Sequence, residues 1–219
     1  MSPGPEAERE KRAAAEAAAE LVEDGMAVGL GTGSTVAHLL PALATRGLAI
    51  RCVATSPATE RMARELGLEV EPFDRLARLD IAIDGADQVA PDGWIVKGGG
   101  GAHLREKIVA AAAERFVVVV DSEKPVEELS PPVPLEVLSF GLPATLRALG
   151  DAELRDVPAS PDGGLIADYL GPVDDPQALA ARLGATPGVV EHGLFGPELV
   201  SDVLVGRGEQ VEALGPGTG

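Results

Sequence analysis

The sequence predicts an α/β protein, built as a doubly wound, mostly parallel sheet with a smaller α+β unit inserted before its last strand. Apolar strand-like segments alternate with helical ones over residues 26–124, the pattern of a parallel sheet covered by helices. After about Leu129 the order becomes strand, helix, strand, strand, helix, strand, which is the split βαβ order of a ferredoxin-like unit. Hydrophobic residues make up 45% of the chain and aromatic residues only 3%, so small aliphatic side chains must build the core.

The elements of the first part have recognisable ends. A helix over residues 6–23 stops at Gly25, because glycine readily terminates helices. Another begins at Ser56, a capping residue, followed by Pro57 at the first helical position. Further helices are predicted from the GTGST turn to about Thr45 and over 102–116. Strands are predicted at 26–31, 50–56 and 68–72, with a strand and turn at 79–87, a strand and glycine loop at 94–101, and a polar-ended strand at 116–124.

The second part is predicted to form its own small sheet. Its strands are expected at 130–138, 152–158, 164–170 and 189–195, and its helices at 142–150 and 175–188. The segment 201–214 contains a strand that rejoins the first sheet. The predicted domains are therefore residues 1–129 together with 204–219, and residues 130–203.

Charge and composition exclude several classes of partner. The formal net charge is −17, so the surface repels nucleic-acid phosphates and anionic lipid. No apolar run approaches the ~20 residues of a membrane span. The N-terminal segment is charged and rich in alanine, without the apolar core of a signal peptide. With Cys52 as its single cysteine, the protein is expected in the reducing cytoplasm.

A glycine-rich turn, GLGTGSTVAHLL at 29–40, follows the first strand. Glycine backbone N–H groups, hydroxyls and a helix N-terminus together favour an anion such as phosphate. A dinucleotide site needs glycine where Ser34 stands and an acidic residue where Thr55 and Ser56 stand, and the P-loop lysine is also missing. The alternative is a tight strand-to-helix turn with a hydroxyl cap.

A pair of carboxylates, Asp84 and Asp87, follows the apolar strand in DIAIDGADQV at 80–89. Ligands of open α/β sheets bind at the carboxyl ends of strands, where these two residues are expected. Such a pair can accept hydrogen bonds from several sugar hydroxyls. The alternative is a structural Asp-Gly turn.

Four consecutive glycines occur in WIVKGGGGAHLREK at 94–107. Ordering four glycines costs backbone entropy, so this run favours a loop whose backbone approaches a ligand. Lys97 precedes it and is suited to stabilising an oxyanion, and Glu106 lies in the first turns of the next helix. The alternatives are a surface cation for Lys97 and a favourable helix-dipole interaction for Glu106.

One more cation, Lys124, follows the VVVVDSEK strand on the expected ligand side, where the alternative is a solvated loop lysine. The histidines, His38, His103 and His192, show no zinc-ligand spacing with Cys52. No serine-hydrolase motif of the GxSxG type is present.

Taken in order, GTGST, DGAD, KGGGGAHLREK and DSEK, with PLEVLSFG and PGVVEHGLF in the second part, resemble the ribose-5-phosphate isomerase type A family over about the whole chain. The resemblance implies a Rossmann-like domain with an inserted ferredoxin-like domain. It also implies no metal or organic cofactor, and a homodimer or homotetramer. The implied reaction interconverts D-ribose 5-phosphate and D-ribulose 5-phosphate through an enediolate, in the non-oxidative pentose phosphate pathway.

The same resemblance implies roles for individual residues. Glu106 matches the catalytic base, aided by Lys97 and by Asp84 or Asp87. The residues implied to bind the phosphosugar are Thr32, Gly33, Ser34, Thr35, Asp84, Gly85, Ala86, Asp87, Lys97, Gly98, Gly99, Gly100, Lys124 and Lys11.

Two other functions remain open on the sequence. A CoA-transferase-like enzyme on a related scaffold would use a glutamate as its nucleophile and need a groove for adenine and pantetheine. A sugar-phosphate sensor would need a DNA-binding domain, for which a 219-residue chain of charge −17 leaves no basic segment.

Overall fold

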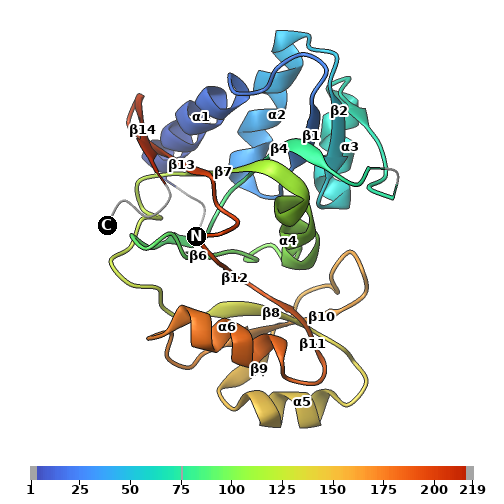
Figure 1. Ribbon diagram of the computed structural model, residues 1–219, viewed down its shortest axis with the longest axis vertical. Coiled ribbons are helices and arrows are strands. Elements are labelled where there is room, and N and C mark those ends of the chain that lie inside the picture. The colour runs from blue at the N-terminus through green and yellow to red at the C-terminus, as the bar shows by residue number, and fades with distance from the viewer. Residues whose placement is uncertain (1–3, 75, 216–219) are drawn as a thin grey trace.

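The computed structural model describes residues 4–74 and 76–215, and its main sheet has seven strands (Figure 1). They are β1 (Ala27–Leu30), β2 (Arg51–Ala54), β3 (Glu69–Val70), β4 (Leu79–Asp84), β7 (Ala113–Val120), β13 (Asp202–Arg207) and β14 (Gln210–Leu214). Their order is β14-β13-β7-β4-β1-β2-β3, and every neighbouring pair is parallel except β13 and β14. The predicted first domain also includes residues 1–3, 75 and 216–219, which lie outside the described residues.

Helices cover both faces of this sheet: α1 (Pro5–Ala19), α2 (Ser34–Arg46), α3 (Pro57–Glu65) and α4 (His103–Ala112). The alternation of β7 shows the two faces. Val117 and Val119 pack in a cluster with residues of α1 and α2, whereas Phe116, Val118 and Val120 pack with residues of α4. Both clusters are largely aliphatic, as the composition predicts. The doubly wound parallel sheet is therefore confirmed, as is the Ser56 cap of α3, whose hydroxyl accepts from the Thr59 N–H.

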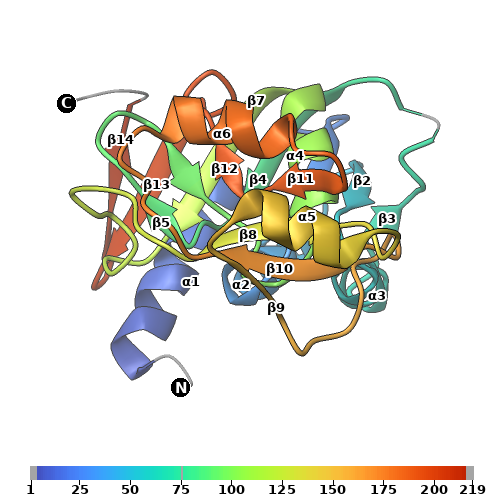
Figure 2. The ribbon, with the colours of Figure 1, turned by 90° about the horizontal axis from the view of Figure 1, so that it is seen from below.

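A second, antiparallel sheet carries four strands in the order β11-β8-β10-β9. They are β8 (Val133–Val137), β9 (Ala152–Leu154), β10 (Leu165–Tyr169) and β11 (Val189–His192). The helices α5 (Leu142–Leu149) and α6 (Pro176–Gly184) lie side by side over one face of this sheet (Figure 2). This connectivity is the predicted ferredoxin-like order, inserted between β7 and β13.

A small third sheet joins the two larger ones. Two predictions were wrong here: the sheet to which the strand near residue 95 belongs, and the single strand at 189–195. The third sheet consists of β5 (Gln88–Val89), β6 (Ile95–Val96) and β12 (Leu194–Phe195), so the strand at 94–97 does not enter the main sheet. The segment 189–195 is also not one strand, because it changes sheets at Gly193. The Gly193 N–H donates to the Pro134 carbonyl, and its carbonyl accepts from the Lys97 N–H. A Cβ at Gly193 would lie 2.2 Å from the Lys97 carbonyl oxygen, so only glycine fits this crossing.

One further boundary differs from the prediction, and the last segment holds one strand more than was predicted. The helix predicted over 102–116 ends at Ala112, because the chain from Ala113 onward pairs with β4. Tertiary strand pairing here overrides the helix propensity of the alanine run. The last segment contains the predicted strand, β13, which rejoins the main sheet beside β7, and a second strand, β14, forms a hairpin with it through a turn at Gly208, where φ is +63°.

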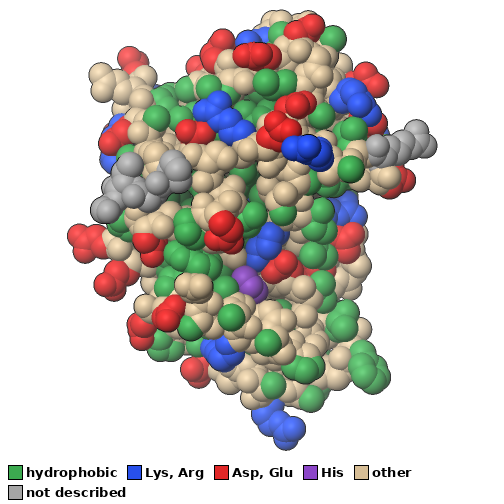
Figure 3. Space-filling view, in the orientation of Figure 1, with side chains coloured by type: hydrophobic (Ala, Val, Ile, Leu, Met, Phe, Trp, Pro, Cys, Tyr) green, Lys and Arg blue, Asp and Glu red, His purple; other side chains and the backbone are tan. Residues whose placement is uncertain are grey.

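The surface agrees with the strongly negative composition. On the face drawn in Figure 3, Asp and Glu side chains are scattered over the upper and middle parts of the molecule instead of gathering in one patch. Within residues 4–74 and 76–215, no helix is both long and apolar enough to cross a membrane.

Candidate active site

A cavity of about 170 Å³ lies where β1, β4 and β7 end and the loop after β6 begins. It brings together every predicted site residue except Asp84. The lining residues are Lys11, Thr32, Gly33, Ser34, Thr35, Gly85, Ala86, Asp87, Lys97, Gly98, Gly99, Gly100, Glu106 and Lys124.

Asp84 lies behind this lining and connects the loop after β1 with the loop after β4 through hydrogen bonds. Its side chain is buried, and its Oδ1 accepts the N–H groups of Thr32 at 3.1 Å and Gly85 at 2.7 Å. The carboxylate packs directly on Gly31, where a Cβ would lie 1.9 Å from the Asp84 Cγ. Glycine at position 31 therefore lets β1 and β4 end close together, and the Asp84 carboxylate aligns the loops that follow.

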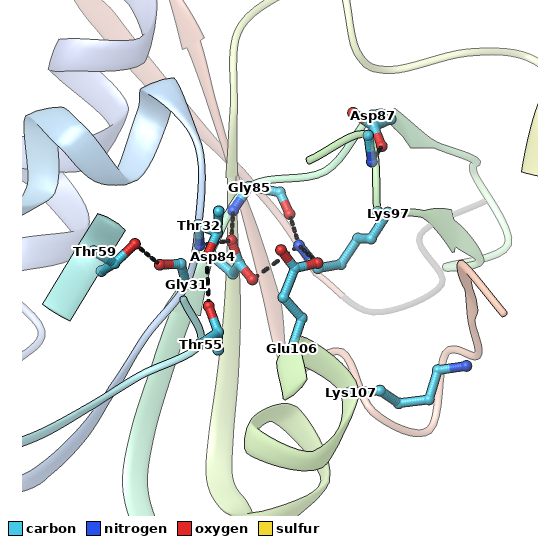
Figure 4. Close-up of polar contacts among 12 residues, drawn as sticks. Gly31, Thr32, Thr55, Thr59, Asp84, Gly85, Asp87, Lys97, Glu106 and Lys107 are labelled. Atoms are coloured by element: carbon cyan, nitrogen blue, oxygen red, sulfur yellow. Dashed lines mark hydrogen bonds and ion pairs between the residues drawn. The ribbon is translucent and has the colours of Figure 1, made fainter. Parts of the chain in front are cut away.

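Lys97 joins the two carboxylates at the bottom of the site (Figure 4). Its Nζ lies 2.9 Å from the Asp84 Oδ2 and 3.3 Å from the Glu106 Oε2. It also donates to the Gly85 carbonyl at 2.5 Å. All three side chains are at least 95% buried. One cation is therefore paired with two carboxylates in a place where water screens their charges little.

This arrangement shifts the ionisation of all three groups. Burial raises the pKa of Glu106 to about 8, with a smaller contribution from Asp84, although Lys97 acts in the opposite direction. Burial likewise raises the pKa of Asp84 against the effect of Lys97. For Lys97, burial opposes the charge, but Asp84 and Glu106 outweigh it and raise the pKa above its ordinary value. Lys97 therefore stays charged, while Glu106 exchanges a proton close to neutral pH, as a general base must.

The glycine loop presents its backbone to the cavity, and at Gly98 and Gly99 a side chain would not fit. Gly98 has φ of +98°, and a Cβ there would lie 2.6 Å from the His103 Nδ1. At Gly99 a Cβ would lie 2.8 Å from the Asp87 Oδ1, and the Gly99 N–H donates to the Asp87 Oδ2 at 2.8 Å. Asp87 thus holds one edge of the loop and lines the cavity as well.

The turn at 32–35 has the features of an anion site. Gly33 has φ of +117° and α2 begins at Ser34, so the first N–H groups of that helix face the turn. The Thr32 hydroxyl lies 2.7 Å from that of Thr55, and the Thr59 hydroxyl donates to the Gly31 carbonyl at 2.9 Å. These contacts fix the backbone of the turn against α3.

Lys11 and Lys124 bring positive charge to the same cavity from distant parts of the chain. Lys11, on α1, is buried and lies 3.1 Å from the Glu8 Oε1. The Lys124 carbonyl accepts the Val89 N–H at 2.9 Å, which fixes the loop after β7. Two cations beside the turn complement a phosphate in an otherwise acidic protein.

None of the three histidines lines the cavity. His103 is fully buried beneath Gly98, and burial lowers its pKa to about 4, so it is neutral. His38 pairs with Glu8 at 3.0 Å, and His192 lies 3.3 Å from the Lys107 Nζ. Among the described residues, no group of three or more His, Cys, Asp and Glu is placed to hold a metal ion.

Sequence reasoning missed three residues that shape the site: Gly31, Thr55 and Arg155. Gly31 lies inside the glycine-rich motif, and its proximity to Asp84 is the only sign of its importance. Thr55 stands where a dinucleotide site would need an acidic residue, and only the distance to Thr32 reveals its contact. Arg155, which contacts the glycine loop from the second sheet, has no local signal at all.

Comparisons with known proteins agree with this geometry. A family model described as ribose 5-phosphate isomerase A (phosphoriboisomerase A) matches residues 51–210. The ribose-5-phosphate isomerase A of Caulobacter vibrioides is 46% identical over 226 residues, covering 96% of this chain and 99% of the relative. The crystal structure of ribose 5 phosphate isomerase A from Neisseria gonorrhoeae superposes with a TM-score of 0.92 at 34% identity, covering 96% of this chain and 97% of that one.

A third relative is a D-ribose-5-phosphate isomerase whose structure was solved in complex with phospho-erythronic acid. It superposes with a TM-score of 0.90 at 36% identity, covering 95% of this chain and 99% of that one. These matches extend over nearly the whole length of both partners, and the family model matches well over half of the chain. The chain therefore belongs to the ribose 5-phosphate isomerase A family, whose members interconvert ribose 5-phosphate and ribulose 5-phosphate.

Proposed function

We propose that this isomerase moves the proton between C2 and C1 of its substrate with Glu106, through an enediolate held by Lys97 and the glycine loop. The observation that carries the proposal is the buried contact between Glu106 and Lys97 at the cavity, 3.3 Å between charged atoms. A base of raised pKa beside a permanent cation suits the removal of a proton next to a carbonyl.

The phosphate end of the sugar is assigned to the turn at 32–35. A phosphate there accepts backbone N–H groups and the hydroxyls of Ser34 and Thr35. Lys11 and Lys124 line the same cavity and neutralise its charge. The reacting carbons then extend toward Glu106.

Ring opening of the furanose is assigned to Asp87. Its side chain lines the cavity, whereas the Asp84 carboxylate is already occupied by Lys97 and by the N–H groups of Thr32 and Gly85. Asp84 in this scheme orients Lys97 and aligns the two loops, and Asp87 accepts a sugar hydroxyl.

The proton transfer follows from these positions. The Glu106 carboxylate removes the C2 proton, the C2 electron pair forms the C1–C2 double bond, and the carbonyl π electrons move onto O1. Lys97 and glycine-loop N–H groups stabilise the charge on O1. Glu106 then delivers its proton to C1, the O2 hydroxyl proton passes to O1, and C2 becomes the ketone of ribulose 5-phosphate.

A direct assay tests this proposal against its two rivals. The protein is given ribose 5-phosphate in D₂O, with and without a chelator, and ketose formation and deuterium at C1 are measured. Ketose that forms at the same rate with chelator and carries solvent deuterium supports the proposal. Binding without turnover favours a sensor, and CoA-dependent acyl exchange favours a transferase; either result overturns it.

We further propose that the enzyme acts in the cytoplasm, in the non-oxidative pentose phosphate pathway, as a homodimer or homotetramer. The single, buried and unpaired Cys52 supports a reducing compartment. Light scattering coupled to size exclusion measures the assembly, and a monomer at micromolar concentration would contradict that part of the proposal.

A further inference from the structure

The glycine loop receives a contact from the second sheet that the proposed chemistry does not use. Arg155, just after β9, donates from its Nη1 to the Gly99 carbonyl at 3.1 Å and to the Gly98 carbonyl at 3.4 Å. Its Nε and Nη2 form a two-point pair with Asp168 on β10, at 2.6 and 2.5 Å. Arg155 is not among the residues lining the cavity, so it reaches the loop from outside the site.

The contact fixes two successive peptide planes. In the peptide between Gly98 and Gly99, the carbonyl accepts from Arg155 and the N–H donates to Asp87 at 2.8 Å. In the next peptide, the Gly99 carbonyl accepts from Arg155. Because a trans peptide is planar, the Gly100 N–H points away from that carbonyl, and Gly100 lines the cavity. The Gly100 N–H therefore lies on the side of its peptide opposite to Arg155.

The loop is also held by the Gly101 N–H, which donates to the Gly98 carbonyl at 3.0 Å, and by the Asp87 contact, but neither of these fixes the Gly99 carbonyl. Glycine peptides rotate more freely than any others, and Gly98 and Gly101 already have φ of +98° and +72°. Asp168 holds the Arg155 guanidinium at two points, so its direction is set before it contacts the loop. Ile166, on the same strand as Asp168, packs beneath Gly101, 3.3 Å from the position of a Cβ there.

We propose that Arg155 is a positioning residue for the isomerase reaction. Held by Asp168, it sets the peptide planes of the glycine loop so that the Gly100 N–H stands beside Lys97 to stabilise the enediolate. This inference rests on the proposed function, since it adds a donor to the same site. It also gives the four-stranded sheet a part in catalysis, although that sheet supplies no residue to the cavity lining.

A matched control exists in the same molecule. Arg105, on α4, forms a two-point pair with Asp162 of the inserted segment, with both nitrogen–oxygen distances at 2.8 Å. Its further contact is with the Pro161 carbonyl at 3.5 Å. Arg105→Met therefore removes an Arg–Asp pair that bridges the same two parts of the chain and leaves the glycine loop contacts intact.

The test compares kcat and KM of Arg155→Met and Arg105→Met with those of the wild-type enzyme. Arg155→Met is expected to lower kcat by ~10–100-fold, the effect of a small misplacement of a catalytic group, with KM changed by less than about threefold. Arg105→Met is expected to keep kcat within about twofold. A kcat of Arg155→Met within twofold of wild type, or an equal loss in both variants, overturns the proposal.

Two milder variants keep the test valid if Arg155→Met fails to fold. Arg155→Lys keeps the charge but cannot hold a carboxylate at two points and a carbonyl at once. Asp168→Asn leaves Arg155 in place without its anchor. Both are expected to lower kcat in the same direction by a smaller factor, and wild-type kcat in both overturns the proposal.

A binding measurement separates positioning from general damage. Phospho-erythronic acid, whose carboxylate carries two oxygens where the enediolate does, should bind Arg155→Met more weakly, in proportion to the loss in kcat/KM. Inorganic phosphate, which needs only the turn at 32–35 and its lysines, should bind as it does to wild type. Equal weakening of both ligands, or of neither, contradicts a positioning role.

Glu106→Gln, assayed in parallel, distinguishes failure of this inference from failure of the proposed function. If Glu106→Gln is inactive while Arg155→Met has wild-type kcat, only the inference about Arg155 fails. If Glu106→Gln keeps near-normal kcat, the proposed function itself fails.

Discussion

Two lysines close to the Phe195 ring, the buried Lys97 and the half-buried Lys107, mark a reactive region and a supporting region at the centre of the molecule. The Lys97 Nζ lies 5.7 Å from the ring centroid and the Lys107 Nζ lies 4.8 Å from it. Lys97 faces two carboxylates, Asp84 and Glu106. Lys107 faces one, Glu191 at 2.7 Å, and donates to the His192 carbonyl at 2.7 Å. Figure 4 shows Lys107 directed away from the group formed by Lys97 and Glu106.

The number of carboxylates explains why the two lysines differ. Around Lys97 the carboxylates, chiefly Asp84 and Glu106, outweigh burial and raise the lysine pKa, whereas around Lys107 burial outweighs Glu191 and the smaller effect of Glu198 and lowers it. The reactive region therefore has two buried carboxyl groups in contact with one cation, and burial raises the pKa of Glu106. In the supporting region one cation contacts one carboxylate, and this pair connects α4, which carries Glu106, to β11.

The largest effect is expected when the Glu106 carboxylate of the reactive region is removed. Glu106→Gln should bind ribose 5-phosphate yet lose ~10²–10⁴-fold in kcat, because the amide cannot accept the C2 proton. Steady-state kinetics and substrate binding measure both quantities. Glu191→Gln, which alters the carboxylate of the supporting region, serves as the control and should change kcat by less than tenfold. A near-normal kcat for Glu106→Gln would refute the base assignment.

The next effect is on stability in the supporting region. Lys107→Met leaves Glu191 partly buried without its cation, and this should lower the free energy of unfolding by about 3 kcal/mol, the lower end for a broken buried pair. Urea unfolding measures the change, and kcat of the folded fraction should fall by less than tenfold. Adding Glu191→Gln should restore part of the stability, since both partners are then uncharged. A double variant as unstable as the sum of the two single ones contradicts the pairing.

The pH dependence of kcat/KM tests the raised pKa of Glu106. A base must be ionised in the free enzyme, and a pKa of about 8 leaves Glu106 mostly protonated at pH 6. We expect kcat/KM to rise with pH, reach half its plateau near pH 8, and lie about 100-fold below the plateau at pH 6. Lys97 keeps its proton over this range because its pKa is raised. A flat profile between pH 6 and pH 9 would be inconsistent with the assignment.

The smallest effect concerns the contact that holds Asp84. Gly31→Ala places a methyl group 1.9 Å from the Asp84 Cγ, so the carboxylate must move and its contacts with Lys97 and Thr32 must weaken. We expect a loss of ~1–3 kcal/mol in unfolding free energy, as for other overpacked sites. Gly85→Ala is the control for stability, because its nearest contacts would be at 3.7 Å. Equal stability of the two variants would show that the tight packing on Asp84 is not required.

Local sequence signals predicted most of the fold and most of the cavity. Apolar runs, helix caps and glycine turns depend on neighbours in the chain, so the alternation over 26–124 and the ferredoxin-like order were both recognised. The turn at 32–35 and the pair Asp84 and Asp87 were found because strand ends in a parallel sheet meet at one edge, and the glycine loop was found from its run of four glycines. All of these residues except Asp84, which lies behind the lining, converge on one cavity, and their catalytic roles stay proposals.

Tertiary structure alone decided the features that depend on distant neighbours. Gly193 moves the chain between sheets because it fits against Lys97, and Asp84 lies behind the cavity because Gly31 leaves room for it. Arg155 reaches Gly98 across 57 positions of sequence. The sequence by itself determined which reactive side chains the protein contains. Their ionisation and orientation were decided by the folded structure, because burial and the sum of nearby charges arise only when distant segments pack together.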